Sequence, residues 1–451
     1  MRRFSCAVFT LVMSMSAHAL ADAATGAADT SRLYLATAVQ SALAQYPSVG
    51  LAKARSDEAR ASVRETFAPW FPSLQLSATA MQYEKPMLVY PMHVLDYRQL
   101  PLFDRTLVQA GLTLDFTLFD AARGARVRRA RYQARATDAT LDATQQALVA
   151  RVIASYLGVL AKREILSAHD QRLTALESEL SRVHQLQQVG RAADVEVLRV
   201  EAALSSAQAD RVHFAAAMDM AESDLGRLIG APSGQVHSAR LVPVTPADSS
   251  AITRDSVILL ALRFSPSILQ AQRHLDAAQA GRTVARGAYW PTLRATGAYV
   301  DRGASEGAYK AEWNAGVMLS YPLFTGGAVR SAVARADAAG RGAAEQLRLA
   351  QIQLAEEVDR ALSAVEESRA RIKSLAVATE RFAEVARIEK LSLEAGSRTQ
   401  TDYLRAEADL LSARAGLVES RHTEIAARAE LARLTGQLNS GWIAQLLENQ
   451  Q

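Results

Sequence analysis

The sequence predicts a mainly α-helical chain that carries four membrane-type β-strands and is built from one unit occurring twice. Three observations predict this fold class. Matching words recur at fixed spacings in the two halves of the 451 residues. A proline-free stretch runs from Arg123 to about Gln188, far longer than an ordinary globular helix. Short segments with strict alternation of apolar and polar residues precede the long helical stretches.

The repeat is visible in the spacing of prolines and of leucine-rich words. Pro47 precedes Pro72 by 25 residues, and Pro266 precedes Pro291 by the same 25. Further along, Leu198-Arg-Val-Glu-Ala matches Leu404-Arg-Ala-Glu-Ala at a shift of 206 residues. We therefore expect one unit over 31–230 and a second over 253–437, because repeated words in constant order mark a repeated structural unit. The shift is larger near the prolines, so the first copy carries about 14 extra residues around positions 85–105.

The segments outside the two units are expected to play minor parts in the fold. Residues 1–21 resemble a secretory signal, with Arg2 and Arg3 before a short apolar stretch and small residues at a cleavage site. A buried N-terminal helix is the alternative interpretation. The Pro/Ser-rich stretch 231–252 is predicted to be a linker and 438–451 a C-terminal tail. The single cysteine, Cys6, would leave with the signal, so no disulfide or cysteine site is expected.

Each unit is expected to begin with a helix, over about 31–67 in the first copy and 255–287 in the second, which the following prolines end. Two strands then follow. Alternation places them at about 73–83 and 107–119 in the first unit, and at about 291–301 and 311–324 in the second. A long helical hairpin completes each unit.

The hairpins are predicted over 123–229 and 328–436, with breaks at Gly190 and Gly396. At 1.5 Å per residue the first helix would reach roughly 100 Å. Apolar residues recur at every seventh position within it, which is the spacing of a coiled-coil seam. These residues are Val152, Val159, Leu166, Leu173 and Leu180.

The four strands imply that several chains share one barrel. Each strand has an apolar row and a polar row and about the length of an outer-membrane strand, but the smallest closed barrels have about eight strands. An open edge in lipid would leave backbone groups without hydrogen bonds. Aromatic residues at the strand ends are expected to form an interfacial belt. They are Trp70, Phe71, Phe119, Tyr289, Trp290 and Phe324. Ordinary strands of a soluble sandwich, with these aromatics in its core, are the alternative.

The arrangement resembles the TolC-like outer-membrane efflux protein family. The most family-like words are Tyr321-Pro-Leu-Phe-Thr-Gly-Gly327 and the turns Val189-Gly190 and Ala395-Gly-Ser-Arg-Thr399. The resemblance implies a homotrimer with a twelve-stranded barrel in the outer membrane, continuous with a long periplasmic α-helical barrel. It further implies an exit duct of a tripartite efflux pump or a type I secretion system, exporting small molecules such as drugs, or proteins.

The resemblance also implies partners. They are a periplasmic adaptor protein, an inner-membrane pump of the RND, ABC or MFS type, and outer-membrane lipid. The second hypothesis is a soluble exported coiled-coil protein, such as an adaptor or a helical toxin, whose strands belong to a soluble β-domain. Neither reading includes catalysis: the sequence has no phosphate-binding loop, nucleophile motif or metal-ligand pair at helical spacing, so we expect no enzyme, cofactor or metal.

Candidate functional residues cluster near the hairpin breaks. By resemblance, Asp402 matches the first position of an aspartate ring at the periplasmic constriction, whereas Arg405 stands at the second. Three copies of each would lie about one turn apart and could pair. Glu196 is the repeat equivalent of Asp402 (402 − 206), and Arg398 is a candidate latch that pairs with a neighbouring helix. Solvated surface charges with no role are the alternative for Asp402, Arg405 and Arg398, and Glu196 is the weaker candidate.

Glycines and their neighbours supply the other candidates. The exposed turns at Gly190-Arg191 and Gly396-Ser397 are predicted contacts for the adaptor, although glycine is equally common as a plain helix cap. Pro322, Gly326 and Gly327 are predicted to bend the chain from strand to helix. The first copy has Asp120-Ala-Ala122 in place of Thr325-Gly-Gly327, so its bend should differ.

Charge gives little support to a nucleic-acid partner. The chain has 51 Lys and Arg against 47 Asp and Glu, a net charge of +4. One basic run follows the second strand, and on a helix it would spread over more than one face. It comprises Arg123, Arg126, Arg128, Arg129, Arg131 and Arg135. Contact with lipid headgroups or a positive duct wall is expected here, with a merely solvated face as the alternative.

Overall fold

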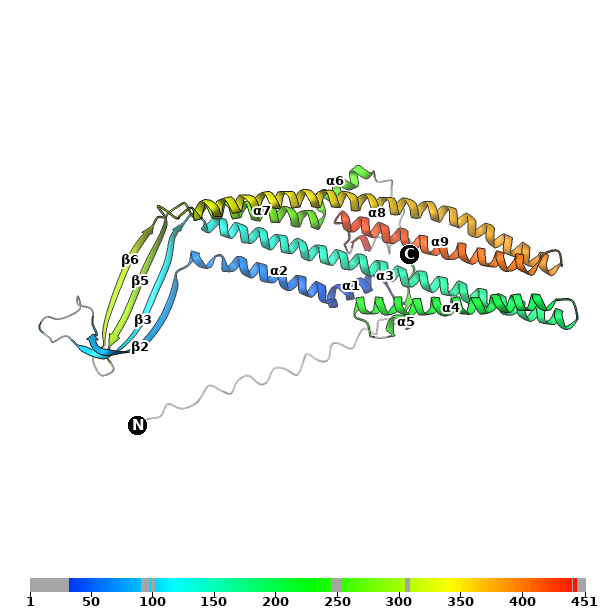
Figure 1. The fold of residues 1–451 in the computed structure, drawn as a ribbon, viewed down its shortest axis with the longest axis horizontal. Helices are drawn as coiled ribbons and strands as arrows, with labels where there is room; N and C mark the ends of the chain where they lie inside the picture. The colour runs from blue at the N-terminus through cyan, green and yellow to red at the C-terminus, as the bar shows by residue number, and fades with distance from the viewer. Residues whose placement is uncertain are drawn as a thin grey trace, which may run out of the picture.

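The computed structural model describes residues 32–90, 98, 102–232, 234–244, 253–304, 309–439 and 441–443. The predicted signal 1–21 and most of the predicted tail lie outside this range. A four-stranded sheet occupies one end of an elongated molecule, and long helices extend from it to the other end (Figure 1). Each half of the chain runs through two short helices, two strands, one long helix and one return helix.

The sheet consists of β2 (Ser73–Leu88), β3 (Phe103–Asp120), β5 (Thr292–Gly303) and β6 (Lys310–Ser320). The order is β2-β3-β5-β6, and every neighbouring pair is antiparallel. The first two strands are longer than predicted, because pairing resumes beyond an irregularity between Gln82 and Met87. The prediction that the fourth strand reaches 324 was wrong: β6 ends at Ser320, before Pro322, which has no N–H to offer a sheet.

The register aligns the apolar residues of the four strands in rows, and the polar residues in the rows between them. Leu76 pairs with Leu112, Leu112 with Tyr299, and Tyr299 with Trp313, which gives an apolar row. The adjacent row contains Gln75, Thr113, Ala298 and Asn314. Since successive side chains on a strand point to opposite faces, the sheet has one apolar and one polar face. The apolar face is uncovered in the single chain, with Leu76 77% and Trp313 76% exposed.

Each predicted first helix is in fact two helices, so those two predictions were wrong. The first is divided into α1 (Leu35–Gln45) and α2 (Pro47–Glu65), and the second into α6 (Arg254–Phe264) and α7 (Pro266–Gly287). Pro47 and Pro266, two of the prolines that mark the repeat, occupy the first turns of α2 and α7. A proline favours an extended residue before it and suits the first turn of a new helix, so it restarts the helix there. A short 3₁₀ helix, η1 (Ala68–Trp70), leads from α2 to the sheet.

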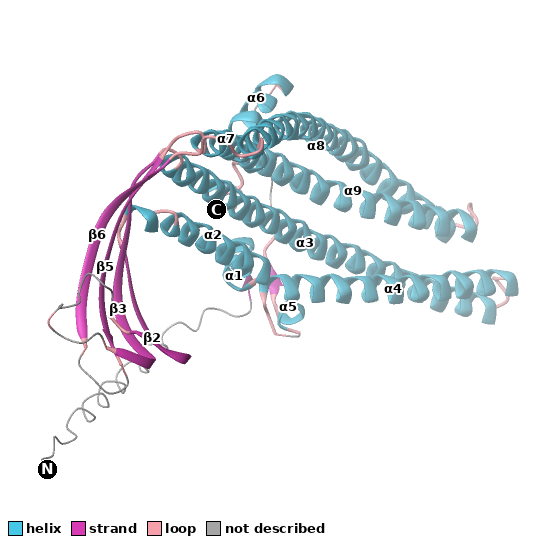
Figure 2. Ribbon diagram, turned by 60° about the vertical axis from the view of Figure 1, so that its left-hand side comes forward, coloured by secondary structure: helices cyan, strands magenta, loops and turns pink. Residues whose placement is uncertain are grey.

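The long helices match their predicted lengths. They are α3 (Arg123–Gln188) with its return helix α4 (Asp194–Ile229), and α8 (Ala328–Glu394) with its return helix α9 (Gln400–Leu434). Near the sheet, α2, α3, α7 and α8 lie side by side in that order. Towards the far end the order is α4, α3, α9 and α8 (Figures 1 and 2). The helices therefore form a wall one layer thick, with α8 at one edge and α2 and α4 at the other.

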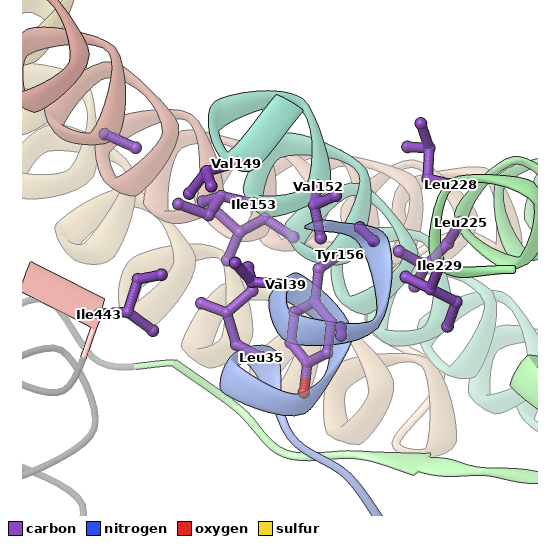
Figure 3. Close-up of a cluster of buried hydrophobic side chains, with 14 of the residues drawn as sticks. Leu35, Val39, Val149, Val152, Ile153, Tyr156, Leu225, Leu228, Ile229 and Ile443 are labelled. Atoms are coloured by element: carbon purple, nitrogen blue, oxygen red, sulfur yellow. The ribbon is translucent and has the colours of Figure 1, made fainter. Parts of the chain in front are cut away.

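The largest core lies where α1 and the two return helices reach the middle of the wall. Tyr156 of α3 is fully buried there, among Leu35 and Val39 of α1 and Leu225 of α4 (Figure 3). Its hydroxyl accepts from the N–H of Val242 at 2.8 Å and lies 2.7 Å from the carbonyl oxygen of Leu33. It thereby joins the short parallel strands β1 (Arg32–Leu33) and β4 (Arg240–Leu241) to α3. The helix α5 (Gln235–Ser238) precedes β4 within the predicted linker.

The predicted heptad positions serve more than one interface. Val152 and Val159 belong to the central core, whereas Leu173 packs with Leu176 of its own helix and with Ala207 of α4. Leu166 and Leu180 are half-buried. The seam between α3 and α4 therefore covers only the distal part of α3, because α1 takes the place of a coiled-coil partner nearer the sheet.

Candidate functional site at the helical tips

The two hairpin tips lie at the end of the molecule opposite the sheet (Figure 1). At the first tip Gly190 adopts φ +72°, and the N–H of Arg191 donates to the Leu186 carbonyl at 2.7 Å. This is the glycine-terminated helix end that a left-handed residue allows. Arg191 is exposed, and Asp194 and Glu196 place two carboxylates in the first turn of α4, where the helix dipole favours them.

The second tip has the same glycine end followed by a capping box. Gly396 has φ +74°, and the N–H of Ser397 donates to the Ser392 carbonyl at 2.9 Å. Thr399 then caps α9: its Oγ1 accepts from the Asp402 N–H at 3.3 Å, and its own N–H and hydroxyl donate to the Asp402 carboxylate at 3.3 and 2.7 Å. Asp402 therefore sets the start of α9 in addition to carrying a charge.

The surroundings of Asp402 favour its ionised form. The hydrogen bonds from Thr399, with smaller effects from Arg398 and Arg405, hold the pKa of the Asp402 carboxyl below its usual range. Within the chain the carboxylate bonds to Thr399, and Arg405 acts on it only as a nearby charge. Arg398 lies 3.8 Å from Glu389 of α8, so its ion pair is formed inside its own hairpin.

A buried polar network between the two hairpins was missed by sequence reasoning. Arg182 of α3 forms a bidentate pair with Glu179 at 2.8 and 2.5 Å and also donates to Gln400 of α9 at 3.3 Å. Tyr403, one turn further along α9, is 3% exposed, and burial raises its pKa to about 12. This network ties α3 to α9 just inside the tips. Glu179 and Arg182 look like solvated helix charges in the sequence, so no pattern distinguished them.

One predicted candidate, Glu196, lies close to this network. The largest cause of the raised pKa of Arg182 is the hydrogen bond that it donates to Glu179, and Glu196 of α4 and Glu394 of α8 add smaller effects. Glu196 therefore belongs to the same electrostatic cluster as the α3–α9 contact. It occupies the first turn of α4, as Asp402 occupies the first turn of α9.

The bends between sheet and helices differ in the two halves. Gly326 and Gly327 have φ values of +58° and +84°, and Gly327 precedes the first residue of α8. In the first half the Asp120 carboxylate stabilises the bend: it accepts from the Ala122 N–H at 2.8 Å and pairs with Arg126 at 2.7 Å. The predicted difference at this bend is thus a carboxylate that accepts from the backbone before α3, in place of a left-handed glycine pair.

Part of the basic run is held at this first bend. Arg123 is buried, donates to the Thr117 carbonyl and lies over the Trp70 ring at 4.9 Å. Arg131 lies 5.4 Å from the Phe67 ring. These arginines fasten strand, helix and aromatic residues together, and Arg128, Arg129 and Arg135 remain exposed. In the described part of the chain, no helix is long and apolar enough to cross a bilayer.

Comparison with known proteins assigns this architecture to a family. The sequence profile of the outer membrane efflux proteins matches residues 38–231 and 257–437, which is most of the chain. The chain belongs to the outer membrane efflux protein family. It is therefore an outer-membrane transport protein, and the family resemblance inferred from its motifs is confirmed.

Curated relatives include export components of several bacteria. The alkaline protease secretion protein AprF of Pseudomonas aeruginosa is 27% identical over 73% of this chain and 69% of its own length. The outer membrane protein TolC of Vibrio cholerae is 26% identical over 74% of this chain and 77% of its own. The outer membrane efflux protein BepC of Brucella suis is 24% identical, with 74% of each chain covered.

Solved structures share the fold. The CmeC outer membrane channel of Campylobacter jejuni has a TM-score of 0.78 at 18% identity, covering 92% of this chain and 89% of that one. The outer membrane protein VceC of Vibrio cholerae has a TM-score of 0.76 at 18% identity, covering 89% and 96%. The mainly helical fold with its terminal sheet is therefore the fold of these outer-membrane proteins.

Proposed function

We propose that three copies of this chain form the outer-membrane exit duct of a tripartite efflux pump or a type I secretion system. The observation that carries the proposal is the shape of the wall. The sheet ends in two unpaired edge strands, β2 and β6, and the helical layer ends in α2 and α4 on one side and α8 on the other. Both layers thus have free edges on the same two sides.

Joining these edges head to tail closes both layers at once. Because β2 and β6 run in opposite directions, β6 of one chain pairs antiparallel with β2 of the next. Such a heterologous contact makes a ring when the rotation closes. Exposed apolar side chains on both helical edges support this contact. They are Leu198, Val212 and Met220 on α4, and Leu349, Ile352, Val377, Ile388 and Leu391 on α8.

The two faces of the sheet support an outer-membrane barrel with a wet lumen. The apolar rows suit lipid, and the polar rows suit water inside the barrel. Trp70, Phe71, Tyr289, Trp290, Phe119 and Phe324 are all at least 45% exposed in the single chain, which suits an interfacial belt. A soluble protein would leave these surfaces in water, and the family membership also speaks against a soluble exported coiled-coil protein.

In this proposal three copies contribute twelve strands, and the chain is two copies of one unit, over 31–230 and 253–437. The two separate matches to the family profile support the repeat. The hairpins of three chains would converge at the tips, where Asp402, Arg398, Arg405 and Glu196 contribute to a periplasmic constriction. Gly190, Arg191, Gly396 and Ser397 would contact a periplasmic adaptor, which links the duct to an inner-membrane pump of the RND, ABC or MFS type.

Native mass spectrometry and conductance measurements test the assembly. The protein is extracted from outer membranes with detergent, weighed as a complex, and inserted into planar lipid bilayers. We expect three chains per particle and discrete conductance steps that scale with salt concentration. A monomer in the soluble periplasmic fraction, or a trimer that does not conduct even when its tip contacts are removed, would contradict the proposal.

A further inference from the structure

Three metal-ligating side chains meet in the middle of the wall, away from both the sheet and the tips. Asp219 and Glu222 lie one turn apart on α4, so they share a face of that helix. His237 of α5 joins them because the chain reverses through Gly230 and Gly234, whose φ values are +68° and +84°. Ligand atoms of the three residues lie within 4.8 Å of one another.

The buried member of this group is held in a fixed orientation. The side chain of Glu222 is 6% exposed, and its Oε1 accepts from Nε and Nη2 of Arg163 at 2.8 and 2.6 Å. Arg163 is itself fixed, because it also donates to the carbonyls of Val236 and Ala239 at 2.8 Å each. The second oxygen, Oε2, is directed at Nδ1 of His237, 2.8 Å away. A carboxylate oriented in this way by an outer partner is typical of metal ligands.

We propose that Asp219, Glu222 and His237 bind one divalent transition-metal ion of the zinc class. One imidazole nitrogen and two carboxylates favour Zn²⁺, Co²⁺, Ni²⁺ or Cu²⁺ over Mg²⁺ and Ca²⁺. A cavity of about 300 Å³ is lined by these three residues together with Ser223 and Arg227, and leaves room for water on the ion. The ion would take the place of the Oε2···Nδ1 hydrogen bond, and the neutral imidazole would then carry its proton on Nε2.

The charges around the site suit a single divalent ion. Arg163 balances Glu222, Arg227 is engaged by Asp224, and Asp219 supplies the remaining negative charge. The ion would join α5 to α4 and so fasten the segment that leads into β4, which Tyr156 already holds from the other side. No motif in the sequence indicates this site, because the expectation of no metal depends on helical spacing. His237 lies 15 residues from Glu222 and outside its helix.

Metal titration of the detergent-solubilised full-length protein tests the proposal. The protein is purified without a histidine tag, stripped with EDTA, and titrated with ZnCl₂ by calorimetry and with CoCl₂ by visible absorption. We expect one ion per chain, a cobalt spectrum that reports nitrogen ligation, and weaker binding at acidic pH. His237→Ala and Asp219→Asn should each weaken binding by at least about tenfold, because each removes one of three ligands. His213→Ala, on α4 with Asp219 and Glu222, is the matched control and should bind as the parent protein does.

Three results would overturn the proposal. One is equal zinc affinity in the parent protein and in His237→Ala, with both still assembled. A second is the absence of saturable zinc binding in the parent protein. Binding of Ca²⁺ with the same affinity as Zn²⁺ would also contradict it, because that result would identify a general acidic surface. Both substituted side chains are largely exposed, so folding should survive, and the oligomer observed on a native gel checks this.

Discussion

At the scale of single residues, Asp402 both caps α9 and carries a charge at the tip, whereas the sequence alone indicates only the charge. Its carboxylate accepts from Thr399 and so completes the cap of α9, and its charge lies at the end of the hairpin. Arg398 next to it pairs with Glu389 of α8, across the turn. The two side chains therefore hold the start of α9 and the end of α8 in one geometry, and the proposed constriction at the tips would depend on that geometry.

Replacing Asp402 and Arg398 together by alanine should raise the single-channel conductance of the purified oligomer in planar bilayers. The cap and the Arg398–Glu389 pair are both lost, so the tip loosens. Thr399→Ala is the matched variant, because it removes the capping hydroxyl and keeps the carboxylate. A rise in both variants would assign the effect to the cap, and a rise in the double variant alone to the charges. Unchanged conductance in the double variant would show that these residues do not hold the tip closed.

The pKa of Asp402 predicts when acid affects the tip. Because the folded-state pKa lies below the ordinary value of about 3.9, the stabilisation is fully present above that value and is lost only as the pH falls through the folded-state pKa. We therefore expect this carboxylate's contribution to closed-state conductance to be constant from about pH 8 to pH 5. A titration of the difference between the parent protein and Asp402→Asn near pH 6 would contradict the assignment.

At the scale of secondary-structure elements, the two hairpins are joined near their ends by polar contacts. Apolar clusters hold each pair internally: Val183, Val197 and Val200 join α3 to α4, and Ala386, Ala406 and Leu410 join α8 to α9. Between α3 and α9 near the tips, the polar contact is Arg182 with Glu179 and Gln400, and Leu404 of α9 packs on the apolar cluster around Leu176. A polar contact can be broken without exposing a large apolar surface, so we expect the tips to separate at Arg182.

Arg182→Gln should therefore open the tips and raise conductance several-fold. The change leaves Glu179, which is 7% exposed, without its partner, at a cost on the order of 3 kcal/mol. Adding Glu179→Gln should restore much of the thermal stability but not the closed tip. Arg211→Gln is the control, because it breaks an exposed pair with Asp170 inside the first hairpin. Equal conductance in Arg182→Gln and Arg211→Gln would show that the α3–α9 contact does not hold the tip.

At the scale of the whole molecule, the single chain is an open wall whose surfaces make sense only in an assembly. Among the residues that the structure describes, its sheet has an uncovered apolar face, and both of its edge strands lack partners. In an outer membrane efflux protein the apolar face can contact lipid, and in the proposed ring the edge strands pair with those of neighbouring chains.

A pair of neighbouring lysine substitutions tests which face meets lipid. Leu76→Lys puts a charge on the apolar face, where it should cost about 2–4 kcal/mol per chain near the bilayer midplane and prevent assembly in the outer membrane. Gln75→Lys, one residue away, puts the same charge on the polar face and should leave assembly intact while changing ion selectivity. Cell fractionation and reversal potentials measure the two outcomes. Normal assembly of Leu76→Lys together with loss of Gln75→Lys would reverse the assignment of the faces.

The sequence by itself determined the element order, the long helices and the two faces of the sheet. These features depend on local rules: helices end at Gly190 and Gly396, and alternation along one strand needs no partner to be recognised. The sequence analysis misplaced the ends of β2 and β6, and it missed the divisions of the first helices at Pro47 and Pro266. An irregular register and a proline that restarts a helix depend on how neighbouring segments pair.

Only the tertiary structure decided which polar residues act together. The Arg182–Gln400 contact joins residues 218 apart in the chain, and Asp219, Glu222 and His237 meet through a chain reversal. In sequence these residues look like solvated helix charges, because a one-layer wall has exposed positions on both of its faces. Helical periodicity identifies which side chains are polar, but the distance between two polar groups on different helices is fixed by packing.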